Sequence, residues 1–388
     1  MKSYRWSQFL LWCFLMTATA ACDGDSSPTS VKTPPEDTKA KLKMEIQNSG
    51  TSTDLYGVWA LNKDIVWAVG GYVGTSGSGI IIKSTDGGNT WKTQHSGDMD
   101  TQQSVTALDQ NRAWSAGFGN QIWYTEDGGD TWTNQLPDDG YNRMFSKVVA
   151  FDEKTVWAVG GGEIMKLTNI DSDMKWEAVP IPKRGIFYGL SIPDENTVWI
   201  VARDRVILRS TDAGESWDMP VAPIGDGWII WDIVARDKDT AWLATAQISP
   251  NENQGHIFGT TDGGKTWKKL YSGELSYGSY PIGFFKAITI PGGWKMDTTP
   301  VFSIMWFLNP YALAFSPNGM KSSDWHPYGA PNPGEVMMLY GLSSLFYEAH
   351  HNVYTTLCWA VGIVGGIVRI EYELDLSAND SVGKTTLE

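Results

Sequence analysis

An eight-residue phrase that occurs four times constrains the fold more than any other feature of the chain. It reads STDGGNTW at residues 84–91 and returns as TEDGGDTW (125–132), STDAGESW (210–217) and TTDGGKTW (260–267). A second phrase of the type VWAVG lies upstream of each octamer, with tryptophans at positions 67, 114, 157, 199, 242 and 359. Most units are spaced by about 40–50 residues, which is typical of a circular or stacked repeat array.

Each unit has the pattern of four short strands. In the first unit, β-branched and aromatic runs at residues 55–61, 65–72, 79–85 and 90–97 are separated by glycine and aspartate, which indicates strands and turns. A repeated four-stranded unit of this length predicts a β-propeller blade. Two degenerate octamers end at Trp176 and Trp325. Counting them, we predict an all-β, seven-bladed propeller of four-stranded blades.

The last unit ends without an octamer or a fourth strand. The N-terminal stretch KMEIQNSG (43–50) shares its Q-x-S-G ending with WKTQHSG (91–97). We therefore predict that the N-terminal strand completes the last blade and closes the ring, so that no sheet edge stays open at the seam.

The octamer is predicted to be a structural turn between the third and fourth strands of a blade. Consecutive glycines supply positive φ, Ser, Thr and Asp side chains hydrogen-bond turn amides, and the tryptophan packs on a neighbouring blade. Calcium binding is an alternative, although one octamer offers few of the oxygens that Ca²⁺ requires. We predict no metal and no cofactor. The structural residues are Ser84, Asp86, Gly88, Trp91, Thr125, Asp127, Gly129, Trp132, Ser210, Asp212, Gly214, Trp217, Thr260, Asp262, Gly264 and Trp267.

The octamer pattern S/T-x-D-x-G-x-T/S-W resembles the Asp-box, or BNR repeat, of sialidases, some endoglucanases and sortilin-like receptors. In those families it is a folding signature away from the active site. The longer pattern W-x-V-G-x-x-G-x-I-x-x-S/T-x-D-G-G-x-T-W is similar to the repeats of the photosystem II stability and assembly factor family. That resemblance implies a seven-bladed propeller and, in some members, a lipoprotein. The family's arginine-rich surface has little counterpart here, because only eight arginines follow residue 22.

The N-terminus resembles a bacterial lipoprotein signal. Lys2 and Arg5 precede an apolar run at residues 9–16, and small residues lead to Cys22. Thr19 stands where such signals usually have leucine, so ordinary signal-peptidase cleavage stays open. We predict a signal peptide (1–21), a flexible tether lipidated at Cys22 (22–42), the propeller (43–376) and a disordered tail (377–388). The signal peptide and the lipidated tether together predict a protein of the bacterial cell envelope, lipid-anchored to a membrane on its non-cytoplasmic side.

Composition narrows the possible functions. The formal net charge of −14 and the absence of a Lys/Arg run argue against nucleic-acid binding. Cys358 is the only cysteine beyond Cys22, and we expect it to be a buried, inert thiol. We also expect a monomer.

An enzymatic role is the competing hypothesis. A sialidase needs an early arginine to bind the substrate carboxylate, and residues 43–84 contain none. A glycoside hydrolase needs two facing carboxylates at the channel mouth. Asp232 and Glu348 are nominated, although nothing in the sequence marks them as a pair. The histidine pair His350 and His351 is a poor metal site if it lies in a strand, where neighbours face opposite ways.

The leading hypothesis is therefore a non-catalytic scaffold for a protein or glycan partner. Loops between the second and third strands, and between successive blades, share the face opposite the octamer turns. Aromatic residues and arginines on these loops are the natural contact residues, although each could be an ordinary rim residue. The candidates are Tyr141, Arg143, Arg184, Arg203, Trp228, Tyr277 and Tyr280.

Overall fold

The computed structural model describes residues 40–136, 140–152, 155–168, 174–247, 254–274, 276–277, 280–281, 285–289, 303–307, 312–316, 326–329, 339–350 and 353–375. The predicted signal peptide, Cys22, most of the tether and the whole C-terminal tail (377–388) lie outside these residues. The turns of the two degenerate octamers also lie outside them. No described helix has the length and apolar character needed to span a bilayer.

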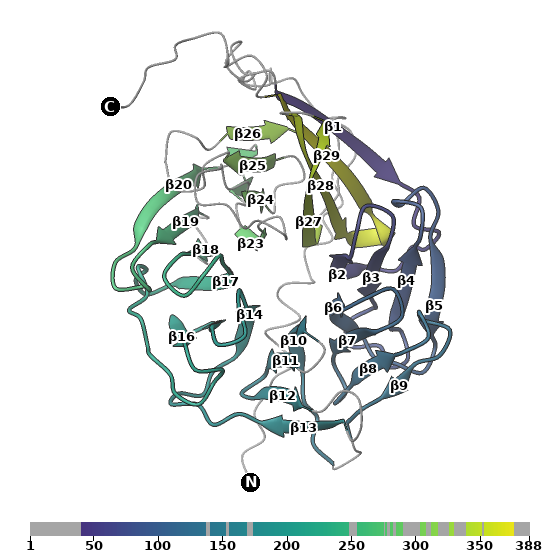
Figure 1. The fold of residues 1–388 in the computed structure, drawn as a ribbon, viewed down its shortest axis with the longest axis horizontal. Helices are drawn as coiled ribbons and strands as arrows, with labels where there is room; N and C mark the ends of the chain where they lie inside the picture. Colours follow the sequence, from purple (N-terminus) through teal and green to yellow (C-terminus); the bar gives the residue numbers. More distant parts are fainter. Residues whose placement is uncertain are drawn as a thin grey trace. The chain divides into compact units, whose positions relative to one another are not determined.

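The described part of the chain is an all-β propeller, which confirms the predicted class (Figure 1). Strands pair antiparallel with their neighbours in the chain, and one short 3-10 turn, η2 (Ile363–Gly365), connects two of them. Among the described four-stranded blades, the first two along the chain, in sheet order, are β2 (Leu55–Ala60), β3 (Val66–Gly70), β4 (Ile80–Ser84) and β5 (Lys92–Ser96), and then β6 (Gln102–Ala107), β7 (Ala113–Gly117), β8 (Ile122–Thr125) and β9 (Thr133–Asn134). The next two are β10 (Phe145–Asp152), β11 (Thr155–Gly160), β12 (Ile164–Thr168) and β13 (Lys175–Ala178), and then β17 (Trp228–Ala235), β18 (Ala241–Gln247), β19 (Gln254–Thr260) and β20 (Lys268–Glu274). The last two are β23 (Phe285–Thr289), β24 (Ser303–Phe307), β25 (Ala312–Ser316) and β26 (His326–Gly329), and then β27 (Leu339–His350), β28 (Val353–Gly362), β29 (Ile367–Asp375) and β1 (Ala40–Gln47).

The prediction of seven four-stranded blades is wrong. The described residues form six four-stranded blades, a three-stranded sheet of β14 (Phe187–Ser191), β15 (Val198–Ala202) and β16 (Val206–Ser210), and a two-stranded ribbon of β21 (Ser276–Tyr277) and β22 (Tyr280–Pro281). Beside β16, Asp218 exchanges two backbone hydrogen bonds with Arg209 (2.7 and 3.0 Å) as an isolated bridge. Pro220 and Pro223 follow. A proline has no N–H to donate, so these residues do not extend the ladder.

The beginning of the chain supplies the outermost strand of the sheet formed by its end, as predicted. β1 pairs antiparallel with β29 from Ala40 opposite Leu374 to Gln47 opposite Ile367. The strand begins three residues before Lys43, where we placed the start of the folded part.

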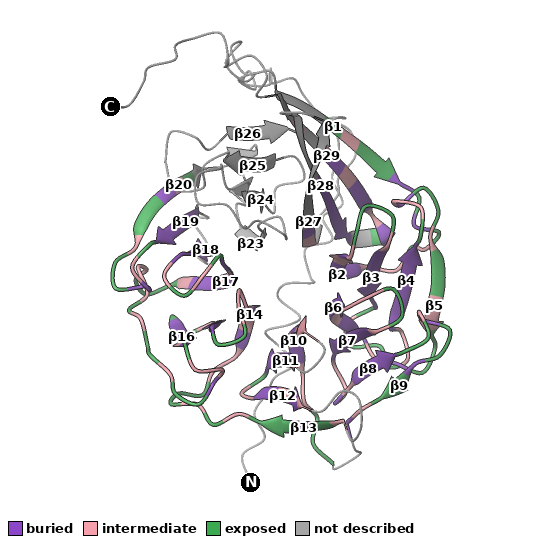
Figure 2. Cartoon of the chain, in the orientation of Figure 1, coloured by how far each residue is buried: buried purple, intermediate pink, exposed green. Residues whose placement is uncertain are grey.

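The VWAVG phrases form the buried second strands of their blades. Strands β3, β7 and β15 are buried at every residue, whereas the outer strands β5 and β9 have no buried residue (Figure 2). Burial of large apolar side chains between sheets is the main stabilising contribution in such a fold. The tryptophans of these phrases are the largest fully buried side chains described: Trp67, Trp114, Trp157, Trp199, Trp242 and Trp359. Cys358 is also buried, as expected.

Hydroxyl side chains join the first strands of neighbouring blades. The Ser343 hydroxyl accepts the N–H of Ala60 (3.0 Å), and the Ser104 hydroxyl accepts the N–H of Val148 (3.1 Å). Because these backbone groups are buried, leaving them without a partner would cost free energy.

Candidate binding site

The four octamers form the same hydrogen-bonded turn. In the first, the Ser84 hydroxyl donates to Asp86 Oδ1 (2.8 Å) and accepts the N–H of Gly88 (2.7 Å). Asp86 also accepts the N–H (2.8 Å) and the hydroxyl (2.6 Å) of Thr90. In each turn the carboxylate oxygens are therefore committed to the turn itself. The same contacts join Asp127 to Thr125 and Thr131, Asp212 to Ser210 and Ser216, and Asp262 to Thr260 and Thr266.

These hydrogen bonds stabilise the ionised carboxylates. The Ser216 side chain is the largest contributor that lowers the pKa of Asp212 to about 2, and Thr266 acts in the same way to lower the pKa of Asp262 to about 2. Hydrogen bonds that a carboxylate accepts stabilise its charged form and lower its pKa. We therefore expect the carboxylates of Asp212 and Asp262 to stay ionised well into the acidic range.

The glycine at the fifth position of an octamer makes room for a tryptophan of the preceding sheet. A Cβ added at Gly214, where φ is +92°, would lie 2.5 Å from Cη2 of Trp157. Trp217 of the same octamer packs edge-on against Trp157, with ring centroids 6.3 Å apart. This octamer thus holds the indole that the previous sheet presents to it. The same arrangement joins Gly129, Trp67 and Trp132. Trp267 also packs edge-on against Trp199, but a Cβ added at Gly264 would first meet Pro220 (2.8 Å), with Trp199 at 3.4 Å.

A basic side chain from a third strand adds to this contact. Lys83 Nζ donates to the carbonyl oxygens of Gly128 (2.7 Å) and Gln110 (3.2 Å) and lies 4.3 Å from the Trp67 ring centroid. Burial lowers the pKa of Lys83. The octamer side of the propeller is therefore occupied by contacts that hold the sheets together.

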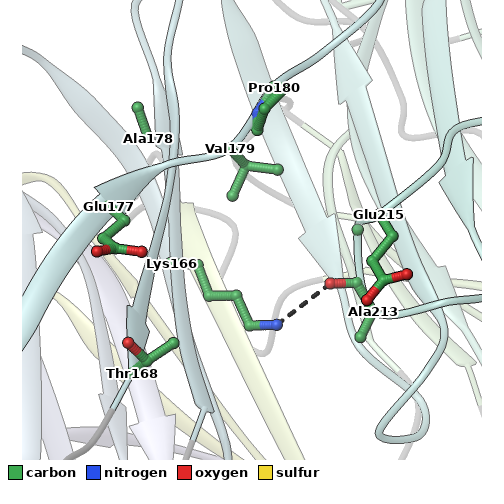
Figure 3. A pocket seen from close by; sticks show the side chains of 9 residues that line it. Lys166, Thr168, Glu177, Ala178, Val179, Pro180, Ala213 and Glu215 are labelled. Carbon is green, nitrogen blue, oxygen red and sulfur yellow. Dashed lines mark hydrogen bonds between the residues drawn. The ribbon is translucent and has the colours of Figure 1, made fainter.

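One pocket of about 400 Å³ lies on the octamer side, between β12, β13 and the turn before Trp217 (Figure 3). At two other octamers the glycine is covered by a glutamine of the preceding outer strand, Gln47 at Gly88 and Gln94 at Gly129, and at Gly264 it is covered by Pro220. Val179 holds the position equivalent to Gln94, three residues after the octamer tryptophan. The Lys166 ammonium crosses the space to the Ala213 carbonyl (3.2 Å). The pocket therefore lies at the junction where Val179 holds the position equivalent to Gln94.

The opposite face, which we call the loop face, carries the loops between second and third strands and between successive blades. Tyr141 is 65% exposed there, and the Arg143 guanidinium lies 4.7 Å from its ring centroid. Arg143 Nε donates to Glu163 Oε2 (2.8 Å), and Nη1 donates to Asn120 Oδ1 (2.9 Å). The Asn120 N–H in turn donates to the Arg143 carbonyl (2.9 Å). Three loops thus hold Arg143, which lies against one exposed aromatic ring.

The other predicted contact residues are distributed around the same face. Arg184 is exposed, and the backbone hydrogen bond from Arg203 to Ile186 (2.9 Å) brings the loop of Arg203 beside that of Arg184. Trp228 belongs to a separate cluster, where its ring stacks on His256 with centroids 4.4 Å apart. Tyr277 and Tyr280 pair through their backbones, and their side chains lie outside the described part of the structure.

Asp232, nominated as a hydrolase carboxylate, is part of an ion pair. It is 3% exposed, its Oδ2 lies 3.3 Å from Lys147 Nζ, and its Oδ1 accepts the N–H of Ile233 (3.0 Å). A buried carboxylate next to a cation is typical of a structural ion pair. The Glu348 side chain and His351 lie outside the described residues, so no distance between the nominated carboxylates is defined.

Sequence reasoning missed the residues that orient these side chains. Asn120 and Glu163 fix Arg143 from other loops, and His256 lies beneath Trp228. The separations along the chain are 23, 20 and 28 residues, and no local pattern reports such contacts. The only signal was that each lies in or beside a predicted loop.

Comparison with known proteins places the chain near photosystem II assembly factors. No family model matches the chain. It is 22% identical over 233 residues to the photosystem II assembly lipoprotein Ycf48 of Synechococcus sp. CC9902, covering 58% of this chain and 65% of that protein. It is 24% identical over 144 residues to the protein of the same name from Trichormus variabilis, covering 36% and 42%. The alignments to such relatives span between 42% and 65% of the relatives' own lengths.

Solved structures show the same fold. The structure of YCF48 bound to a D1 peptide matches with a TM-score of 0.58 at 14% identity, over 88% of this chain and 99% of that one. A catalytically inactive virginiamycin B lyase from Staphylococcus aureus with quinupristin matches with a TM-score of 0.59 at 14% identity, over 85% and 99%. The predicted resemblance to photosystem II assembly factor-like propellers is confirmed.

Proposed function

We propose that this chain is a non-catalytic, envelope-anchored scaffold that binds a protein partner on its loop face during assembly of a larger complex. Curated relatives carry the name photosystem II assembly lipoprotein, and one similar propeller was solved with a bound peptide. The proposal takes from them the class of function, protein binding in assembly, and leaves the identity of the complex open.

The observation that carries the proposal is the exposed ring of Tyr141 beside the fixed guanidinium of Arg143. Tyrosine and arginine dominate binding hot spots, and a contact residue that is already fixed loses less conformational entropy on binding. Arg143 lies against Tyr141 and is itself held by two charged or polar contacts, to Glu163 and Asn120. The octamer face, by contrast, uses its polar groups internally.

The test is capture of envelope proteins on the tagged chain, with variants on both faces. We expect Tyr141→Ala and Arg143→Ala to reduce recovery of the partner by at least about tenfold, the loss expected when a hot-spot residue is truncated. The matched control is Glu215→Ala on the octamer side, where the residue is exposed. Equal recovery by all three variants would refute the loop-face site.

We further propose that a lipid on Cys22 anchors the scaffold. The charged start, the apolar run and the small residues before Cys22 support this, as do relatives named as lipoproteins. Metabolic labelling with a fatty acid should mark the wild-type chain, and the label should disappear in Cys22→Ser. A Cys22→Ser chain that still carries the label would contradict the proposal.

A further inference from the structure

The first strand of every described sheet with three or four strands contains a β-bulge near its start. The register shifts in β2, β6, β10, β14, β17, β23 and β27. A bulge takes one residue out of the ladder and redirects its side chain, and bulges occur often beside binding sites. Strands β2, β6, β10, β14 and β17 lie innermost in the propeller (Figure 1). We call the redirected residues whose side chains are described the bulge ring: Tyr56, Gln103, Ser146, Tyr188 and Trp231.

The bulge ring lies at the loop-face end of the inner strands. Each first strand begins where the loop from the preceding sheet ends, and the shift falls within its first few residues. Tyr188 and Trp231, from the adjacent strands β14 and β17, stack with ring centroids 5.0 Å apart and planes 26° apart. Both side chains are only partly buried. The innermost strands therefore present a double aromatic surface on the face proposed to bind a partner.

The Trp231 indole offers its carbon surface rather than its donor. Its Nε1 atom is buried and has no hydrogen-bond partner among the described residues, while the residue as a whole is only partly buried. A group that approaches the exposed part meets carbon and π electrons. Such a surface suits an aromatic side chain, which gains both apolar burial and a stacking contact.

An ion pair occupies the strand positions next to the bulged residues. Lys147 and Asp232 directly follow the bulged residues of β10 and β17, and their charged groups are 3.3 Å apart. Gly189 lies on the intervening strand, where a Cβ would be 2.9 Å from the Asp232 Cα. The Lys147 side chain is 33% exposed and that of Asp232 only 5%. The accessible end of this ion pair is therefore the ammonium.

We propose that Tyr188, Trp231 and Lys147 form a subsite that takes an aromatic side chain of the protein partner with a carboxylate of the partner next to it. This inference rests on the proposed function and specifies the chemistry of the partner. The ring stacks on the Tyr188–Trp231 pair, and the carboxylate faces Lys147. The subsite is separate from Tyr141, which lies in the loop before β10.

The experiment selects a phage-displayed library of random peptides on the purified full chain. We expect enrichment of peptides in which Phe, Tyr or Trp lies within two residues of Asp or Glu. The affinity of the enriched peptides should fall at least about tenfold for Tyr188→Leu combined with Trp231→Leu. Leucine keeps the site apolar, and thermal unfolding of the variant establishes that it folds. Lys147→Gln should remove the preference for the acidic residue while keeping that for the aromatic one.

Tyr141→Ala separates this inference from the proposed function. The selected peptides should bind Tyr141→Ala as tightly as wild type, because they occupy the bulge ring alone. Peptides without an aromatic residue, or equal binding to the double leucine variant, would overturn the subsite. Binding of neutral oligosaccharides with no peptide enriched would also overturn it and would assign the site to glycans. A loop face that fails to capture a partner would leave the peptide measurement unaffected.

Discussion

Substitution of Gly214 by alanine tests the role of the octamer most sharply. At φ +92° an alanine adopts the left-handed region, which costs about 1–2 kcal/mol. Its Cβ would also lie 2.5 Å from Cη2 of Trp157, a residue only 1% exposed and enclosed by core residues. Overpacking of this kind costs about 1–3 kcal/mol. We therefore expect Gly214→Ala to lower the free energy of unfolding by about 2–5 kcal/mol.

The matched control is Gly74→Ala. Gly74 has φ +84°, and an added Cβ there would meet nothing within 4 Å. It should therefore lose only the backbone contribution of about 1–2 kcal/mol. Urea unfolding followed by circular dichroism measures both variants. If Gly214→Ala is no less stable than Gly74→Ala, the octamer glycine does not make room for Trp157, and the reasoning is refuted.

Three further substitutions test separate contacts. Lys83→Met should lower the free energy of unfolding by about 1–3 kcal/mol, because the Gly128 carbonyl loses its charged donor; urea unfolding measures this, and a loss below about 0.5 kcal/mol would contradict it. The stability that the Asp212 carboxylate contributes should be present above about pH 4 and should be lost as pH falls through its folded pKa of about 2. The unfolding free energies of wild type and Asp212→Asn should therefore converge between pH 4 and pH 2. A difference that stays constant over this range would be the contrary result. Val364→Gly should raise stability by about 0.5–1 kcal/mol, since Val364 is a β-branched residue at φ +53° that is 66% exposed, and an unchanged or lower melting temperature would count against this.

The features that repeat in the sequence were the ones that could be predicted. The N-terminal strand was assigned from a shared Q-x-S-G ending, and the structure gives a physical reason for that similarity. Gln47 covers Gly88 as Gln94 covers Gly129, so both glutamines perform the same task at neighbouring junctions. The octamer turns were predictable because their hydrogen bonds span at most four residues of the chain.

The features that depend on distant partners could not be predicted. Pro220 and Pro223 were visible in the sequence, but the octamer before them indicated a complete fourth strand, so the count of four-stranded blades was wrong. The bulges in the first strands insert a residue without changing the pattern of apolar residues enough to be recognised. The ion pair of Lys147 and Asp232 joins residues 85 apart in the chain, and no periodicity reports such a contact.

Site-specific photo-cross-linking measures the central claim most directly, namely that the two faces differ in role. A photoreactive phenylalanine analogue placed at Tyr141, and separately at Asn89 in the first octamer turn, is irradiated in intact cells. The account predicts a discrete cross-linked protein from position 141 and none from position 89. A partner that cross-links from position 89 and not from position 141 would show that the octamer face binds and would contradict the account.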